Sequence, residues 1–152
     1  MKKERIYSRA AKIAEEAGEI KLAQKLWKKE LRRASRKKWF FVAAQAAEKL
    51  GDSSRAQEFY RQDSHCWEER ENPYFAAVRA DEAGDRESAR RLYEKWLASD
   101  QEDNIVYTGM AAEELGDFER ALKIYIKVGN PEAIERVEKK IGHPEKIKMI
   151  YE

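Results

Sequence analysis

Apolar and small residues recur along this chain at a helical spacing that restarts several times. Counted back from Gly18, they stand at positions −11, −8, −7, −4 and −1, and the same offsets hold when counted back from Gly51. The first set is Tyr7, Ala10, Ala11, Ala14 and Ala17, and the second is Phe40, Ala43, Ala44, Ala47 and Leu50. Apolar residues three and four positions apart share one face of an α-helix. The pattern therefore predicts an amphipathic helix that ends at each of these glycines.

The residues that follow the glycines predict a second helix in each case. An acidic residue, an alanine and an aromatic stand at +1, +5 and +9 from four glycines, which are Gly18, Gly51, Gly84 and Gly116. The alanines are Ala23, Ala56, Ala89 and Ala121, and the aromatics are Trp27, Tyr60, Tyr93 and Tyr125. Glycine ends a helix readily because it adopts the left-handed conformation without a steric penalty, and an aspartate after it can cap the next helix. Each repeat is therefore predicted to be a pair of antiparallel helices, and Glu19 is predicted to cap less well than the later aspartates.

The four glycines are spaced 33, 33 and 32 residues apart, so the chain is an internal repeat. Repeats of this length cannot bury an apolar face alone and are stable only when they stack on their neighbours. We therefore predict an all-α fold, an α-solenoid of helix hairpins that forms a single domain over residues 1–152. Gly142 is predicted to turn a fifth, truncated unit, because Ile147, Ile150 and Tyr151 follow it at the expected offsets. The predicted units lie at about 2–35, 36–70, 71–100, 101–129 and 130–152.

This combination of a small residue, Gly-Asp, alanine and an aromatic at fixed offsets resembles the tetratricopeptide repeat (TPR), and the resemblance covers nearly the whole chain. The resemblance implies a right-handed superhelix in which the first helix of every unit lines a concave face. The chain departs from the family pattern in having alanine four residues before each glycine and in lacking most of the prolines that close a unit. Helical-hairpin repeats of vesicle-coat proteins are similar in this respect.

Three further offsets in each first helix are predicted to face the concave surface. Positions −10, −6 and −3 lie about 120° around the helix from the apolar stripe, at about 100° per residue. The predicted partner-binding groove consists of Phe41, Gln45, Glu48, Tyr74, Val78, Asp81, Val106, Met110 and Glu113, with Ser8, Lys12 and Glu15 at the same offsets in the first unit. Exposed apolar patches commonly mark binding sites, so we expect the apolar members, Tyr74 included, to be at least partly solvent-accessible beside an acidic row. In the alternative interpretation these side chains only pack between adjacent first helices.

Basic residues are concentrated between the first two units. Residues 1–50 contain 15 lysines and arginines against 6 aspartates and glutamates, whereas the whole chain has a formal net charge of only +2. Seven basic residues fall within 28–38, a segment that we call the basic elbow, namely Lys28, Lys29, Arg32, Arg33, Arg36, Lys37 and Lys38. Polybasic segments attract phosphate groups, and neighbouring aromatics can stack on bases. The alternative is a solvated helix face, because Leu31 and Ala34 continue the apolar stripe through the segment.

The sequence contains few residues suited to catalysis or to cofactor binding. The single cysteine, Cys66, excludes a disulfide within the chain, and His65 and His143 are too few to complete the roughly four ligands of a zinc site. There is no glycine-rich phosphate loop, and no stretch approaches the roughly 18 apolar residues of a membrane span. We therefore expect no catalytic residues, no metal and no cofactor, and we expect a cytoplasmic protein that does not bind membranes.

These observations favour a non-enzymatic protein–protein interaction scaffold that holds a peptide or helix of a partner protein on its concave face. One alternative is an anion-binding module that binds RNA, DNA or an acidic protein on the basic elbow. Another is an engineered or purely structural repeat protein. Self-association stays open in all three cases, and the sequence favours an apolar or basic segment as the occupant of the groove.

Overall fold

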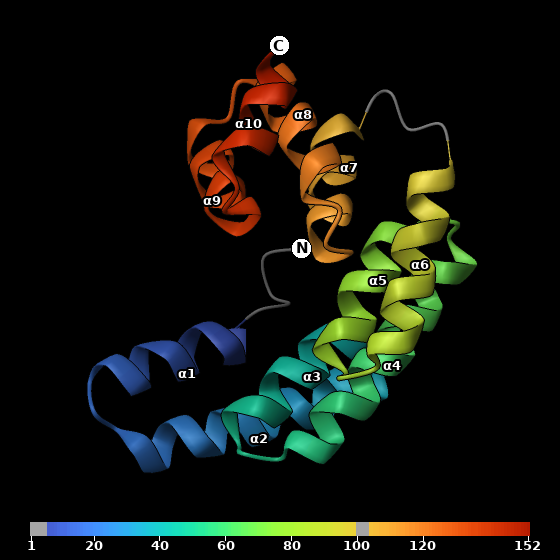
Figure 1. The fold of residues 1–152 in the computed structure, drawn as a ribbon. Helices are drawn as coiled ribbons and strands as arrows, with labels where there is room; N and C mark the ends of the chain where they lie inside the picture. Colours follow the sequence, from blue (N-terminus) through green and yellow to red (C-terminus); the bar gives the residue numbers. More distant parts are fainter. Residues whose placement is uncertain (1–5, 100–103) are drawn as a thin grey trace.

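The computed structural model describes residues 6–99 and 104–152, and these residues form ten helices and no strand (Figure 1). The helices are α1 (Ile6–Glu16), α2 (Ile20–Arg36), α3 (Phe40–Lys49), α4 (Ser53–Glu69), α5 (Pro73–Glu82), α6 (Arg86–Ala98), α7 (Ile105–Glu114), α8 (Phe118–Val128), α9 (Pro131–Ile141) and α10 (Pro144–Tyr151). The predicted all-α class is confirmed.

Each helix from α1 to α9 packs against the helix that follows it in the chain. Figure 1 shows the helices following a curved path, with α1 and α2 at one end and α9 and α10 at the other, and with α1, α3 and α5 on the inner side of the curve. The buried side chains form three clusters in succession along the chain instead of one central core. Stability therefore depends on contacts between neighbouring helices, which is typical of repeat architectures.

The predicted turning points are confirmed. Five glycines that separate paired helices have positive φ angles, namely Gly18, Gly51, Gly84, Gly116 and Gly142. At the end of α3 the N–H of Gly51 donates to the carbonyl of Glu48, and the N–H of Asp52 donates to the carbonyl of Ala47 at 3.0 Å. This pair of hydrogen bonds is the Schellman motif, which satisfies the last carbonyl groups of a helix.

The helix starts also follow the predicted capping pattern. The side chains of Asp52, Asp85, Asp117, Asn72 and Asn130 each accept a hydrogen bond from the backbone N–H three residues later. Glu19, at the start of α2, makes no such bond. Its longer side chain is a poor N-cap, because a capping oxygen must reach the N–H groups of the first turn from a short stem. The prediction that Glu19 caps less well than the aspartates is confirmed.

Small residues allow the helices of a pair to approach closely. The residues seven positions before four of the turning glycines are Ala11, Ala44, Ala77 and Gly109, and all are buried. A Cβ atom on Gly109 would lie 2.9 Å from side-chain atoms of both Ile124 and Tyr125 on α8. Glycine is therefore required where α7 and α8 meet.

Two turns between pairs contain a non-glycine residue in the left-handed region. Lys38 and Glu71 have φ angles of 56° and 57°, in the left-handed region that non-glycine residues rarely adopt. In both cases the next residue closes the turn, because the N–H of Trp39 donates to Ala34 and the N–H of Asn72 donates to Trp67, each at 3.0 Å. The two turns are 33 residues apart, so the strained conformation is itself part of the repeat.

Replacing Gly51 by alanine should test the conformational requirement at the turns. No atom lies within 4 Å of a Cβ built at Gly51, so its φ of +76° is the only obstacle to a side chain. We expect Gly51→Ala to lower the free energy of unfolding by about 1 kcal/mol. Gly51→Asn should cost less, because asparagine tolerates the left-handed region. Urea denaturation of the three proteins measures the difference, and an alanine variant as stable as the wild type would contradict the prediction.

Candidate binding groove

Four of the six predicted groove residues of the first two units line one cavity, and Glu15 and Glu48 do not line it. Its volume is about 410 Å³, within the range of about 300–1,000 Å³ typical of ligand pockets. The lining side chains include Ser8 and Lys12 of α1, Glu30 of α2, and Trp39, Phe41 and Gln45 at the start of α3. Four of these stand at the −10 and −6 offsets, so the structure brings together side chains that the sequence placed on one face.

In the third and fourth units, the residues at the same offsets differ in their exposure to solvent. Val106 and Met110 are exposed, at 42% and 41%, and Val78 is half-buried. Tyr74 is buried, with only 5% of its surface exposed, so the expectation that it is accessible is wrong.

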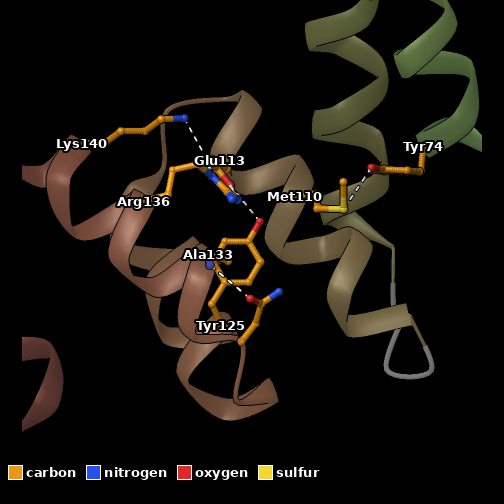
Figure 2. A network of polar contacts seen from close by, with 8 residues as sticks. Tyr74, Met110, Glu113, Tyr125, Ala133, Arg136 and Lys140 are labelled. Carbon is orange, nitrogen blue, oxygen red and sulfur yellow. Dashed lines mark hydrogen bonds and ion pairs between the residues drawn. The ribbon is translucent and has the colours of Figure 1, made fainter.

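The burial of Tyr74 follows from the aromatic residues around it. Its ring centroid lies 5.5 Å from that of Trp96 and 4.7 Å from that of Tyr107, which belong to α6 and α7. Its O–H donates to the Met110 sulfur at 3.5 Å, as Figure 2 shows. Aromatic pairs add about 0.5–1.5 kcal/mol to the gain from burial, which draws Tyr74 into the contact between neighbouring pairs.

Three of the four acidic side chains at offset −3 accept a hydrogen bond from the aromatic residue of their own pair. The Trp27 N–H donates to Glu15 at 2.9 Å, the Tyr60 O–H donates to Glu48 at 3.0 Å, and the Tyr125 O–H donates to Glu113 at 2.9 Å. Each donor is 12 residues after its acceptor in the sequence. We call these contacts the aromatic–carboxylate clasps. The spacing of 12 residues is present in the sequence. The contact was not predicted, because the acidic residue was assigned to the concave surface and the aromatic residue to the second helix.

Glu113 is fully occupied by the protein itself. Arg136 of α9 donates to both carboxylate oxygens at 2.9 and 2.8 Å, and Lys140 donates at 2.8 Å (Figure 2). The hydrogen bond from Arg136, with those from Lys140 and Tyr125, lowers the pKa of Glu113 to about 2 against the opposing effect of burial. Glu113 therefore links α7 to α9 and is not part of an open acidic row, whereas Glu48 and Asp81 are exposed.

A second cavity lies beside Asp81, between α5, α6 and the end of α7. Its volume is about 520 Å³, and its walls include Arg90, Tyr93 and Glu114. Arg90 forms an ion pair with Glu94 of its own helix, at 3.1 Å, so it does not pair with Asp81. Asp81 lines this cavity and is exposed.

An arginine that the sequence analysis overlooked links the second and third pairs. The Arg79 guanidinium donates to Asp63 at 3.0 Å, and its central carbon lies 3.8 Å from the ring centroid of Phe41. The side chains of Arg79 and Asp63 are both only 15% exposed. The ring and the carboxylate together hold the guanidinium at the junction, and one face of Phe41 is covered by it.

Glu30 is the second overlooked residue. It stands on the buried face of α2 with Trp27 and Ala34, and only 1% of its surface is exposed. One carboxylate oxygen accepts a hydrogen bond from Ser8 at 2.7 Å. The other oxygen is buried and accepts no hydrogen bond from any residue that the structure describes. The sequence does show that Glu30 stands at the spacing of the apolar residues of its helix. It was overlooked because it lies within the basic elbow, which was interpreted by its positive charge.

The basic elbow lies over two aromatic rings. Six of its seven basic side chains are exposed, and Arg33 is half-buried. The Trp39 ring lies 4.6 Å from the Lys37 nitrogen and 5.4 Å from the Arg33 guanidinium carbon, and Tyr7 lies within 6.0 Å of Lys29 and Arg33. These rings therefore contact the cations of the chain itself. Anion binding at the elbow stays a prediction.

Two further findings concern the described residues as a whole. Among residues 6–99 and 104–152, no group of three or more His, Cys, Asp or Glu side chains is arranged to hold a metal ion. Over the same ranges no helix combines the length and the apolar character needed to cross a membrane.

Acid should weaken the link between α7 and α9. Because the pKa of Glu113 is lowered from 4.5 to about 2 on folding, its stabilisation is complete above 4.5 and is lost as the pH falls toward 2. We expect the free energy of unfolding to fall by roughly 1–2 kcal/mol over this range, less than the full shift implies, because both cations are about half exposed and therefore screened.

The measurement is urea unfolding of the wild type and of Glu113→Gln at a series of pH values. The variant should show a shallower fall in stability between pH 4.5 and pH 2. Glu119→Gln is a suitable control, since Glu119 is 57% exposed and should leave the slope unchanged. Equal slopes for wild type and Glu113→Gln would contradict the role assigned to Glu113.

Comparison with known proteins identifies no relative of this chain. No protein-family model matches it, no curated protein matches its sequence, and no solved structure matches it. Its function is therefore inferred from its own residues and their geometry.

Proposed function

We propose that this protein is a non-enzymatic, cytoplasmic scaffold that binds a segment of a partner protein along its first helices. Its helix pairs would form a right-handed solenoid of about five TPR-like units, the last one truncated. The observation that carries the proposal is the cavity of about 410 Å³ lined by Ser8, Lys12, Phe41 and Gln45, which come from the same offsets in two successive units.

Exposed apolar side chains at the same offsets support this proposal. Val106 and Met110 are both more than 40% exposed on α7. Apolar surface left in water is a common mark of a protein interaction site. A segment lying across the first helices would bury these side chains in turn.

The charges favour an apolar or basic segment. Glu48 and Asp81 are exposed on this side of the helices, and Lys12 is the one basic side chain at the offsets −10, −6 and −3 in the first four units. A groove that grips the carboxylate end of a peptide would need several lysines, arginines or asparagines at these offsets. We therefore assign an internal segment of a partner protein, extended or helical, as the occupant.

The proposal can be tested with a phage-displayed library of random peptides selected on the immobilised full-length protein. For a selected peptide, Val106→Ser and Met110→Ser should each weaken binding by more than about 1 kcal/mol, roughly fivefold in Kd. Leu22→Ser on α2 is the matched control, because Leu22 is 48% exposed but stands outside the groove. Calorimetric titration measures the affinities. Peptides that bind equally well to all four proteins would overturn the proposal.

A second candidate function is anion binding on the basic elbow, and it is supported by the exposure of six of the seven cations. A fluorescent RNA oligonucleotide should then bind at low salt, with an affinity that falls steeply as salt is added, because phosphate contacts release counterions. Glutamate replacements of Lys28, Arg32 and Arg36 together, whose side chains are exposed, should abolish binding and leave the thermal melt nearly unchanged. Binding that survives the charge reversal, or that ignores salt, would rule this function out.

A further inference from the structure

The junction between the second and third pairs and the junction between the first and second pairs are built from equivalent positions. Three residues form the later junction, which are Phe41, Asp63 and Arg79. Their equivalents 33 residues earlier in the sequence are Ser8, Glu30 and Ala46. The repeat therefore allows a direct comparison of two sites with the same backbone arrangement and different side chains.

The junction between the first and second pairs keeps the acidic residue, as Glu30, but has no basic residue at the position of Arg79. Asp63 has Arg79 as its counterion, at 3.0 Å. Glu30 has the methyl group of Ala46 at the position equivalent to Arg79, and Ala46 is fully buried. Ser8 supplies a neutral hydrogen bond to one oxygen of Glu30, while the other oxygen is buried and accepts none from the described residues. A buried carboxylate that has no counterion among the described residues is unfavourable, and a cation from outside would reduce that cost.

The cavity beside Glu30 can admit such a cation. Glu30 lies in its wall together with the aromatic side chains of Trp39 and Phe41, and its volume of about 410 Å³ is ample for a long side chain. Aromatic faces attract guanidinium groups, and a planar guanidinium can hydrogen-bond to a carboxylate while it lies against a ring. The chain itself uses this combination where Arg79 lies between Asp63 and Phe41.

We propose that this cavity binds the side chain of an arginine from a partner protein, with the guanidinium on Glu30 and against the aromatic wall. The partner would thereby supply the group that the third unit carries itself as Arg79. This inference rests on the proposed scaffold function, since a partner segment must cross the first helices for its arginine to enter.

The surrounding charges restrict the kind of segment. Lys12 also lines the cavity and is exposed, so its ammonium group opposes an incoming cation. The basic elbow adds six exposed cations nearby in the same pair of helices and would repel a polybasic peptide. The occupant is therefore a segment with a single arginine and otherwise apolar or neutral side chains.

The experiment uses the full-length protein and the tripeptide acetyl-Ala-Arg-Ala-amide as the probe, followed by NMR. Shift changes should centre on the amides of Ser8 and Gln45 and on the indole N–H of Trp39. Glu30→Gln, which keeps the shape and removes the charge, should weaken binding about tenfold. Lys12→Met should strengthen it about twofold or more, because it removes an opposing charge. A purely structural role of Glu30 predicts no gain of affinity from Lys12→Met.

Two control peptides test the chemistry of the side chain. The citrulline peptide has the shape of the arginine peptide without its charge and should not bind, and the lysine peptide should bind at least about threefold more weakly, because an ammonium lacks the planar fork. The inference is overturned by the absence of shift changes with about 10 mM arginine peptide. Equal binding of lysine and arginine peptides, or full binding by Glu30→Gln with an unchanged thermal melt, would also overturn it. If Glu30→Gln changes the thermal melt, the affinity of Lys12→Met tests the inference instead, and no gain of affinity would overturn it.

Failure of this inference can be told apart from failure of the proposed scaffold function. Library peptides that depend on Val106 and Met110, contain no arginine and ignore Glu30→Gln would overturn the arginine site and leave the scaffold function standing. If the arginine peptide binds at the cavity but no library peptide depends on Val106 or Met110, the scaffold function is overturned and the arginine site stands.

Discussion

The aromatic–carboxylate clasp is the interaction on which the arrangement of the first, second and fourth helix pairs depends. A donor on the second helix reaches a carboxylate on the first, and the sequence separation of 12 residues sets the register of the two helices around the turning glycine. Burial, with the adjacent carboxylate, raises the pKa of Tyr60 and Tyr125, so both phenols keep the proton that they donate. Hydrogen bonds to a charged acceptor are about twice as strong as neutral ones, which suits a clasp at the edge of a small core.

Charged contacts between pairs extend this arrangement along the chain. Lys49 of α3 reaches Glu15 of α1 at 3.2 Å, and Arg136 of α9 reaches Glu113 of α7 at 2.8 Å. In each case a cation from the next pair completes the coordination of a clasped acid. Glu30 departs from this pattern, because a buried carboxylate there has a serine as its partner and an alanine at the position of the counterion. Local departures from an otherwise consistent design are expected at functional sites, and Glu30 coincides with the cavity that carries the proposed function.

The division of the core into successive clusters shapes what the protein can do. Each cluster is buried by neighbouring helices alone. The side chains on the inner surface are therefore not needed to fill a central core. Side chains at the −10 and −6 offsets are therefore free to differ from unit to unit. They line a cavity in the first two units, contribute Tyr74 to an aromatic cluster in the third and are exposed as Val106 and Met110 in the fourth. Such a surface can recognise an irregular segment of a partner, whereas a strictly uniform groove cannot.

The sequence by itself determined the helix pairs, their turns and their caps, because these depend on local properties. The apolar period defines each helix, Gly51 and its equivalents adopt a conformation that other residues avoid, and Asp52 caps through a bond to its own first turn. It also placed Ser8, Lys12, Phe41 and Gln45 on one side. Only the tertiary structure decided that Tyr74 is buried, that Arg79 stacks on Phe41 and that Glu30 has no counterion among the described residues. Those outcomes depend on which residue of the next pair stands opposite, and helical periodicity specifies the direction of a side chain but not the partner that it meets.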